Sequence, residues 1–171
     1  GLGLDLVMLD LWIYWWHRIN HLVPFLWRFH EVHHLDEMLD TTSALRFHFG
    51  EVILSSLVRA TVIFVLAVPL SSVVVFEILV LVSALFHHSN LKLPHGFEQA
   101  LSFIIVTPSI HWVHHHAKRV DTDSNYSTVL SIWDRVFVSR SKTVRTVDMP
   151  MGVERVKERG FFGLILKPFR R

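Results

Sequence analysis

The sequence predicts an all-α integral membrane protein, a helical bundle with a transmembrane hairpin and a cytosolic, His-rich helical cap. Of the 171 residues, 51% are hydrophobic and the mean hydropathy is +0.38, which exceeds what a soluble domain of this length needs. The six tryptophans lie near the ends of apolar runs, where aromatic belts form in membrane proteins. Thirteen histidines crowd the chain, most of them in short clusters. These three observations together favour membrane helices that carry a metal site.

The first two helices are expected at the N-terminal end of the chain. The apolar run from Leu2 to Trp16 is too short to cross a bilayer, and continuing it through His21 completes the span. Pro24 then interrupts the chain, and a second helix is predicted from Phe25 to Leu35. Both helices therefore carry histidines at the inner side of the membrane.

The stretch from Val52 to His88 predicts the transmembrane hairpin. Its charged residues are Arg59 and Glu77, and the segment 69–72 (Pro-Leu-Ser-Ser) is a turn signal near its middle. Two arms of about 17 residues result, at the lower limit for crossing a bilayer. One long kinked span is the alternative, but it would place the histidine clusters on opposite sides, where they could not share metals. In a hairpin Arg59 and Glu77 lie at comparable depth, and we expect them to pair.

The remaining elements are expected to be short. The apolar run from Phe97 to Thr107 cannot span a bilayer and is predicted to lie in the membrane interface. A helix is expected to start near Pro108, a polar loop from Asp121 to Tyr126, and a short amphipathic helix from Val129 to Arg135.

The composition indicates how the chain is divided into domains and which classes of protein it excludes. We expect one catalytic domain over residues 1–140, with N-terminal spans missing before it, and a basic C-terminal tail over residues 141–171. The positive flank beside membrane spans indicates the cytoplasmic side. No basic patch with interleaved aromatic residues suggests nucleic-acid binding. The sequence has no cysteine, which excludes disulfides and iron–sulfur clusters.

Eight histidines occur in three boxes, and His87–His88 form a further pair. Residues three and four apart share one face of a helix, so the imidazoles of each box should point the same way. Neutral imidazole is a common metal ligand, and a single tetrahedral zinc takes only about four ligands, so this number of imidazoles predicts two metals. The boxes are His17-Arg18-Ile19-Asn20-His21, His30-Glu31-Val32-His33-His34 and His111-Trp112-Val113-His114-His115.

The boxes suggest oxygen chemistry more than hydrolysis. All-imidazole sites without a carboxylate bridge are unusual for hydrolysis, whereas a pair of irons supplies one-electron and dioxygen chemistry. An oxidant of that strength needs a dry apolar pocket, for which a lipid tail is the natural substrate. Three alternatives remain. The second box also matches the His-Glu-x-x-His pattern of a zinc metalloprotease with Glu31 as general base, which leaves the other boxes without a role. A bis-imidazole haem site needs fewer histidines. A metal-binding membrane protein without oxygenase activity, such as a transporter, would need ligands at mid-membrane depth.

Six segments in order resemble the fatty acid hydroxylase superfamily, also called the sterol desaturase family, over roughly residues 5–140. The resemblance implies a membrane-bound di-iron histidine-box oxidoreductase that hydroxylates or desaturates lipids, or cleaves ether lipids, with dioxygen and an external electron donor. The segments are His17 to His21, Leu26 to His34, Thr42 to His48, Phe86 to Asn90, Thr107 to His115, and Asp123 through Arg135.

The resemblance also implies the ligands. It assigns metal binding to His17, His21, His30, His33, His34, His88, His111, His114 and His115. Two further histidines are less certain: His48, in a recurring Arg-Phe-His, is either a ligand or a supporting group, and His87 is adjacent to His88 where some members have a spaced pair. Iron is the expected metal, two ions per chain, and zinc could substitute.

Supporting groups and partners complete the expectation. Asp10, two turns before His17, and Asp123 and Asn125 after the third box are candidates for orienting the imidazoles. His95 and His116 are expected at the surface. The sequence has no nucleotide or flavin fingerprint, so electrons should come from a separate protein such as a cytochrome b5-like donor, a ferredoxin or a reductase. We expect a multi-pass protein with its boxes facing the cytosol, in the plasma membrane of a bacterium or the endoplasmic reticulum of a eukaryote. Sterol, fatty acyl chain, sphingoid base and alkylglycerol all remain open as substrates.

Overall fold

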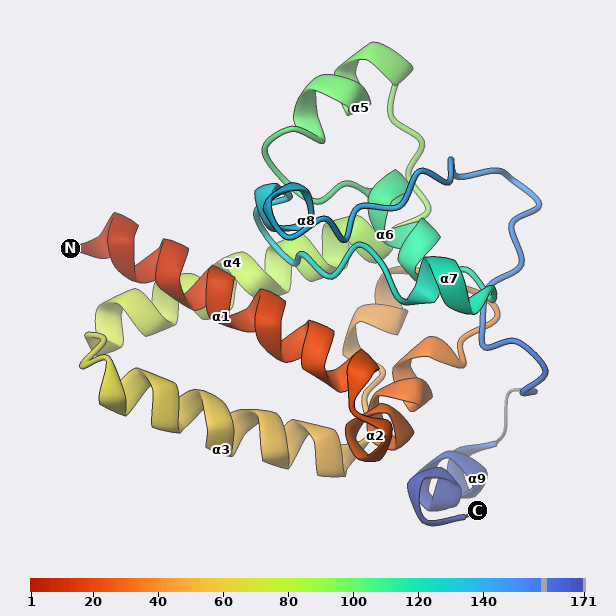
Figure 1. Ribbon diagram of the computed structural model, residues 1–171, viewed down its shortest axis with the longest axis horizontal. Coiled ribbons are helices and arrows are strands. Elements are labelled where there is room, and N and C mark those ends of the chain that lie inside the picture. The colour runs from red at the N-terminus through yellow and green to blue at the C-terminus, as the bar shows by residue number, and fades with distance from the viewer. Residues whose placement is uncertain (158–159, 171) are drawn as a thin grey trace.

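The computed structural model confirms the all-α prediction for the residues that it describes, 1–157 and 160–170 (Figure 1). The residues Glu158, Arg159 and Arg171 of the basic tail lie outside this part of the chain. No named strand occurs in the described part. Its helices are α1 (Leu2–Leu22), α2 (Pro24–His34), η1 (Thr41–Leu45), α3 (Phe49–Val65), α4 (Leu70–His88), α5 (His95–Leu101), α6 (Pro108–His114), α7 (Arg119–Thr122), α8 (Ile132–Val136), α9 (Phe161–Leu166) and η2 (Lys167–Phe169).

The first two helices have nearly the predicted bounds. α1 continues past His21 to Leu22, and one extended residue, Val23, separates it from α2. Pro24 occupies the first turn of α2, where its missing N–H and fixed φ are compatible with a helix start. α1 and α2 pack against each other, which brings the first two histidine boxes together.

α3 and α4 reverse the chain as predicted, although the turn comes slightly earlier. α3 ends at Val65, Ala67 has a positive φ of 50°, and Pro69 precedes α4 with the extended conformation expected of an N-cap. The two helices diverge from this turn as the arms of a V (Figure 1). α3 starts next to His48 and α4 ends at His88, so both arms have their histidines at the same end of the molecule.

α4 is the one helix of the described part that is long and apolar enough to cross a membrane, with a mean hydropathy of 2.2 over its best window. Only 17% of that window is buried within the protein. Its exposed face includes Val74, Ile78 and Val82, and the neighbouring α3 exposes Leu57 and Phe64. Contiguous apolar faces of this kind are rarely exposed to water, so they suit contact with lipid.

The segment between α7 and α8 is held by two buried carboxylates, Asp134 of α8 and Asp10 of α1. Asp134 is fully buried and accepts hydrogen bonds from the backbone N–H groups of Tyr126 and Ser127 and from the hydroxyl of Ser139. Asp10 of α1 accepts from Val129, Leu130 and Trp133. The loop between α7 and α8 is thereby fixed against α1, beside the first histidine box.

The predicted amphipathic helix and the predicted loop are both shorter than expected. α8 starts at Ile132, three residues after the predicted start, because Val129 and Leu130 use their N–H groups to bind Asp10. Asp121 and Thr122 end the short helix α7, so the loop begins after them. The chain beyond residue 140 returns to the third box, where Ala117 N–H donates to Pro150 and Gly152 N–H donates to His115.

The predicted ion pair between Arg59 and Glu77 is present and links the arms of the V. In a poorly polarisable environment, removing one partner leaves an uncompensated charge, whereas removing both does not. Arg59→Leu and Glu77→Leu are therefore expected to lower the thermal unfolding midpoint much more individually than the double substitution does. A double-mutant cycle on the protein in lipid nanodiscs measures this. Additive effects of the two single substitutions would contradict the coupling.

Candidate metal centre

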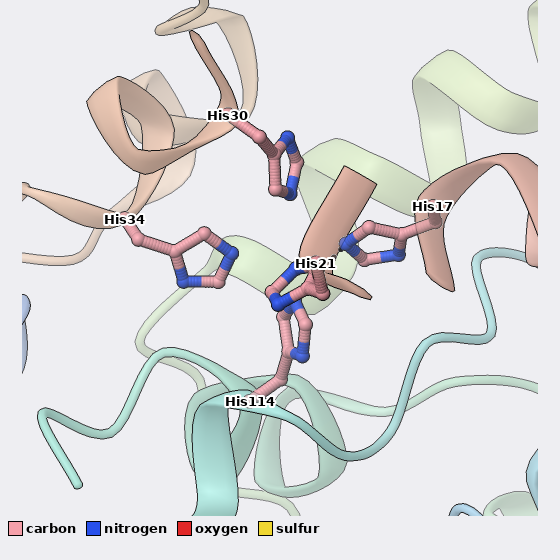
Figure 2. Close-up of side chains that lie close together, drawn as sticks. All are labelled: His17, His21, His30, His34 and His114. Atoms are coloured by element: carbon pink, nitrogen blue, oxygen red, sulfur yellow. Dashed lines mark hydrogen bonds between the residues drawn. The ribbon is translucent and has the colours of Figure 1, made fainter. Parts of the chain in front are cut away.

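The structure gathers all nine histidines predicted as ligands into two clusters. Cluster 1 contains His17, His21, His30, His34 and His114, and cluster 2 contains His33, His88, His111 and His115. In each cluster one ring nitrogen from every residue lies within 4.8 Å of the others. Figure 2 shows the imidazoles of cluster 1 pointing toward one another from α1, α2 and α6. The consecutive helices α1 and α2 and the distant α6 thus converge on one point.

The spacing of the ring nitrogens fits a metal ion. In cluster 2 the Nε2 atoms of His33 and His88 are 3.2 Å apart, those of His88 and His111 3.0 Å, and those of His111 and His115 3.1 Å. Two nitrogens that bind one ion at about 2.1 Å, at right to tetrahedral angles, are roughly 3.0–3.4 Å apart. Cluster 1 has the same spacing of 3.0 Å between His17 and His114.

Several of these nitrogens have no other partner in the protein. The Nε2 atoms of His21, His30 and His34 are buried and accept or donate no hydrogen bond within the described part of the chain. Buried polar atoms are normally satisfied, so a group of orphaned nitrogens around one point indicates an additional ligand. The donor set, imidazole without cysteine or a carboxylate in either cluster, suits iron, zinc, copper or nickel.

Hydrogen bonds at the outward-facing Nδ1 atoms hold several of the rings in place. A hydrogen bond at Nδ1 fixes the tautomer of the ring and leaves Nε2 available for a metal. The acceptors are the backbone carbonyls of Tyr126 for His17 (2.8 Å), Arg46 for His33 (3.2 Å), Ala84 for His88 (2.8 Å) and Ser124 for His114 (2.6 Å). Asp123 lies 3.4 Å from Nδ1 of His21. The predicted loop therefore supplies three of these contacts.

Glu51 is the supporting residue that the sequence analysis missed. Its Oε1 lies 2.7 Å from Nδ1 of His30, and both side chains are buried. A carboxylate in this position orients the imidazole and raises its basicity toward a metal. A buried carboxylate in the first turn of the apolar helix α3, three residues after His48, is the signal that could have revealed it.

Burial keeps the cluster imidazoles of α2 and α6, and His115 after α6, in the neutral form that binds metal. It lowers the pKa of His33, His34, His111, His114 and His115 well below the ordinary value of 6.5, and neighbouring histidines lower it further. A neutral ring leaves a nitrogen lone pair for coordination.

The same pKa depression predicts acid sensitivity of the metal-free protein. Below pH 6.5 the unfolded chain takes up protons at these imidazoles while the folded chain does not, so the free energy of unfolding decreases as the pH falls. We expect the unfolding midpoint of the metal-free protein to fall steadily from pH 7 to pH 5. A midpoint that is constant over this range would contradict the neutral, buried state of the rings.

The structure also shows where the less certain candidates lie. His48 is buried outside both clusters, where its Nδ1 accepts from Gly50 N–H and caps α3. His87 is buried, and the centre of its ring lies 4.0 Å from the centre of the His111 ring. It is therefore next to cluster 2 but not part of it. Asp10 binds the segment 129–133 and forms no hydrogen bond with an imidazole in the described part of the chain. Asn125, at a φ of 54°, binds the carbonyl of Ile110 and stabilises the turn that carries Ser124 and Tyr126.

Of the two histidines expected at the surface, His95 is exposed, but the expectation for His116 is wrong. His116 is 5% exposed and its Nδ1 lies 2.7 Å from Asp121. The reason is that the tail after residue 140 covers this side of the third box, with His116 bridged to Met151. The general base of the alternative protease site, Glu31, forms an ion pair with Lys167 and belongs to neither cluster.

A cavity of about 300 Å³ connects cluster 2 and part of cluster 1 to the space between α1, α3 and α4. Five cluster residues line it, His17, His30, His33, His88 and His111, and the opposite end is formed by Arg59 and Glu77. Its volume is at the lower end of the range for small-molecule sites. The candidate metal centre therefore opens toward the apolar helices and not only toward solvent.

Comparisons with known proteins show which family the chain belongs to. The model of the family described as "Fatty acid hydroxylase" matches residues 3–139. The chain is 27% identical over 168 residues to an ornithine lipid hydroxylase of Rhizobium tropici, covering 98% of this chain and 50% of that protein. It is 35% and 33% identical over 128 residues to the alkylglycerol monooxygenases of Xenopus tropicalis and Homo sapiens, covering 75% of this chain and 28% of each. The chain thus spans half or less of the length of these relatives.

No solved structure shows a significant match to the chain. The family match, in contrast, extends over most of its length and includes every histidine of both clusters. The resemblance noted in the six sequence segments is confirmed, and the protein belongs to the fatty acid hydroxylase family.

Proposed function

We propose that this chain carries the catalytic site of a membrane-bound lipid monooxygenase that holds two iron ions, one in each histidine cluster. The observation that carries the proposal is the convergence of eight buried imidazoles and the half-buried His17 into two clusters beside a cavity that opens between apolar helices. The family match and the hydroxylase and monooxygenase relatives support it. When bound, the iron pair supplies the activation of dioxygen that amino-acid side chains cannot provide.

The residues of the chain have three tasks in this reaction. The Nε2 atoms of the two clusters hold the metals, and Glu51 with the four backbone carbonyls keeps those rings oriented. The cavity admits an apolar chain and excludes water, which limits side reactions. One oxygen atom enters a C–H bond of the lipid, and two electrons and two protons reduce the other to water.

The proposal includes a multi-pass arrangement. α4 with the neighbouring α3 and α1 would cross or enter the bilayer, and the histidine clusters would lie at its cytosolic face under a helical cap. The basic residues after Lys118 favour that orientation. Residues 1–140 would form the catalytic domain, with residues 141–171 as a basic tail. A separate protein, such as a cytochrome b5-like donor, a ferredoxin or a reductase, would supply the electrons.

Incorporation of labelled oxygen tests the activity. The iron-loaded protein in lipid nanodiscs is supplied with ¹⁸O₂, a ferredoxin with its reductase, and either 1-O-hexadecylglycerol or an ornithine lipid. We expect ¹⁸O in a lipid product detected by mass spectrometry. If iron is bound and neither lipid acquires ¹⁸O, the proposed activity on these lipids is wrong, and metal binding without oxygenase activity becomes the better description.

The protease alternative is disfavoured by the position of Glu31. A general base must reach a water molecule at the metal, whereas the carboxylate of Glu31 is paired with Lys167 and is not among the atoms of cluster 1. The sequence therefore matches the His-Glu-x-x-His pattern, but the structure does not provide the free general base that a zinc metalloprotease needs.

A further inference from the structure

The cavity beside the metal centre is lined by polar as well as apolar side chains. Along α3 it has a polar wall of Ser55, Ser56 and Arg59, and α4 contributes aliphatic side chains such as Val80 and Leu81 together with Glu77, His87 and His88. Polar groups among membrane helices are costly and normally serve a specific purpose. A cavity meant only for an unsubstituted hydrocarbon chain would not need a polar wall.

Arg59 is only partly satisfied by the protein. Its Nη1 donates to Glu77, and the guanidinium carbon lies 5.8 Å from the centre of the Trp12 ring. Its Nε–H is buried and has no acceptor within the described part of the chain. A guanidinium has five donors in one plane, and the bond to Glu77 uses one of them, so N–H groups of Arg59 remain for a molecule in the cavity that this residue lines. An unpaired donor between membrane helices is stabilised by any oxygen that a bound molecule brings to it.

The other end of the polar wall also has an unpartnered atom. Glu51 is 7% exposed, its Oε1 binds His30, and its Oε2 is buried without a hydrogen-bond partner. Eight residues of helix separate Glu51 from Arg59, which is about 12 Å along the axis of α3. Glu51 therefore lines the cavity beside the imidazoles, and Arg59 lines it about 12 Å deeper along α3.

We propose that Arg59 is a specificity-determining residue that selects lipids with an oxygen atom in the part of the chain that enters the cavity. Arg59 donates a guanidinium N–H that Glu77 does not use to an ether, ester or hydroxyl oxygen that lies about 12 Å from the imidazole end of the cavity. Glu77 positions the guanidinium through the ion pair. A plain alkyl chain leaves the donor unsatisfied, and a site built to hydrogen-bond one group discriminates strongly against the analogue that lacks it. The inference rests on the proposed lipid oxygenase function because it assumes that the cavity binds the substrate.

Binding of two matched brominated probes tests the selection without requiring turnover. Trp16 lines the cavity, and bromine quenches tryptophan fluorescence on contact. The iron-loaded protein in nanodiscs is titrated with 10-bromodecan-1-ol and with 1-bromodecane, each measured as its mole fraction in the bilayer. The other tryptophans are quenched as well, so the same titration is made with the Trp16→Phe variant. The difference in quenching between the two proteins measures binding in the cavity. We expect the alcohol to reach half of this quenching at about a 10-fold lower mole fraction than the bromoalkane, the effect of one hydrogen bond to a charged donor.

Two variants and one control assign the preference to Arg59. The double substitution Arg59→Leu with Glu77→Leu removes both charges together, and Arg59→Lys keeps a charge opposite Glu77 but removes the guanidinium N–H groups. Both are expected to bind the two probes equally well. Thr61→Val alters an exposed residue of α3 outside the cavity and should keep the preference. Equal binding of the probes to the unsubstituted protein, or a preference that survives in either folded Arg59 variant, would overturn the proposal.

The labelled-oxygen experiment and this binding experiment fail independently. If the alcohol is preferred but no lipid acquires ¹⁸O, the selection by Arg59 stands and the oxygenase activity does not. If lipids are oxidised and the two probes bind equally, the activity stands and the selection by Arg59 does not.

Discussion

Replacing His34 with alanine is expected to abolish lipid oxidation and to remove the metal of cluster 1. The side chain is fully buried, and both ring nitrogens lack a partner in the described part of the chain, so no other contact compensates for a lost metal bond. Loss of a group that only supports a ligand typically costs 10–100-fold in affinity or activity, and loss of the ligand itself should cost more than about 100-fold. Iron analysis and ¹⁸O incorporation measure the two effects.

His115→Ala makes the complementary change in cluster 2, and His116→Ala is the matched control. His115 and His116 are adjacent and buried, but His116 is bound to Asp121 outside both clusters. We therefore expect His115→Ala to lose the other metal, whereas His116→Ala loses stability and keeps both. If His116→Ala lost as much iron as His115→Ala, metal loss would reflect general unfolding and the assignment of cluster 2 would be wrong.

Glu51→Leu is expected to have the second largest effect, because the substitution leaves the Nδ1–H of His30 buried without an acceptor. The contact of 2.7 Å is then lost, and His30 can rotate or change tautomer. By analogy with other groups that orient a metal-binding histidine, iron affinity or turnover should fall by about 10–100-fold. Competition with a chelator measures the affinity, and the labelled-oxygen assay measures the turnover.

Glu51→Gln separates the role in hydrogen bonding from the role of the charge. The amide oxygen of glutamine can still accept from Nδ1 of His30, so this variant should retain most of the iron affinity that Glu51→Leu loses. Unchanged iron affinity and turnover in Glu51→Leu would show that His30 does not depend on this carboxylate.

The clustering of the histidines could be predicted from sequence because helical periodicity determines the direction of their side chains. In α2, His30 and His34 lie one turn apart and enter cluster 1, while His33 enters cluster 2. The spacing predicts a shared face, but it does not predict that one short helix serves two neighbouring clusters. That division depends on the angle at which α2 meets α6, which no local pattern encodes.

The supporting groups were harder to predict because most of them are backbone atoms. Tyr126 and Ser124 act through their carbonyls, so their side chains carry no signal of this role. Glu51 is twenty-one residues from His30 and meets it only because the chain turns back after α2, so that α3 packs against α2. The burial of His116 has the same origin, since the tail that covers it follows more than twenty residues later.

The most direct test of the two-cluster account is the iron content of the purified, iron-loaded chain, combined with X-ray absorption at the iron edge. If each cluster binds one ion, the chain holds about two iron ions. Because the clusters contain five and four histidines, each ion is surrounded by nitrogen and shows the multiple-scattering signature of imidazole. A chain that binds one iron or none at saturation, or irons surrounded mainly by oxygen, would contradict the two-cluster account.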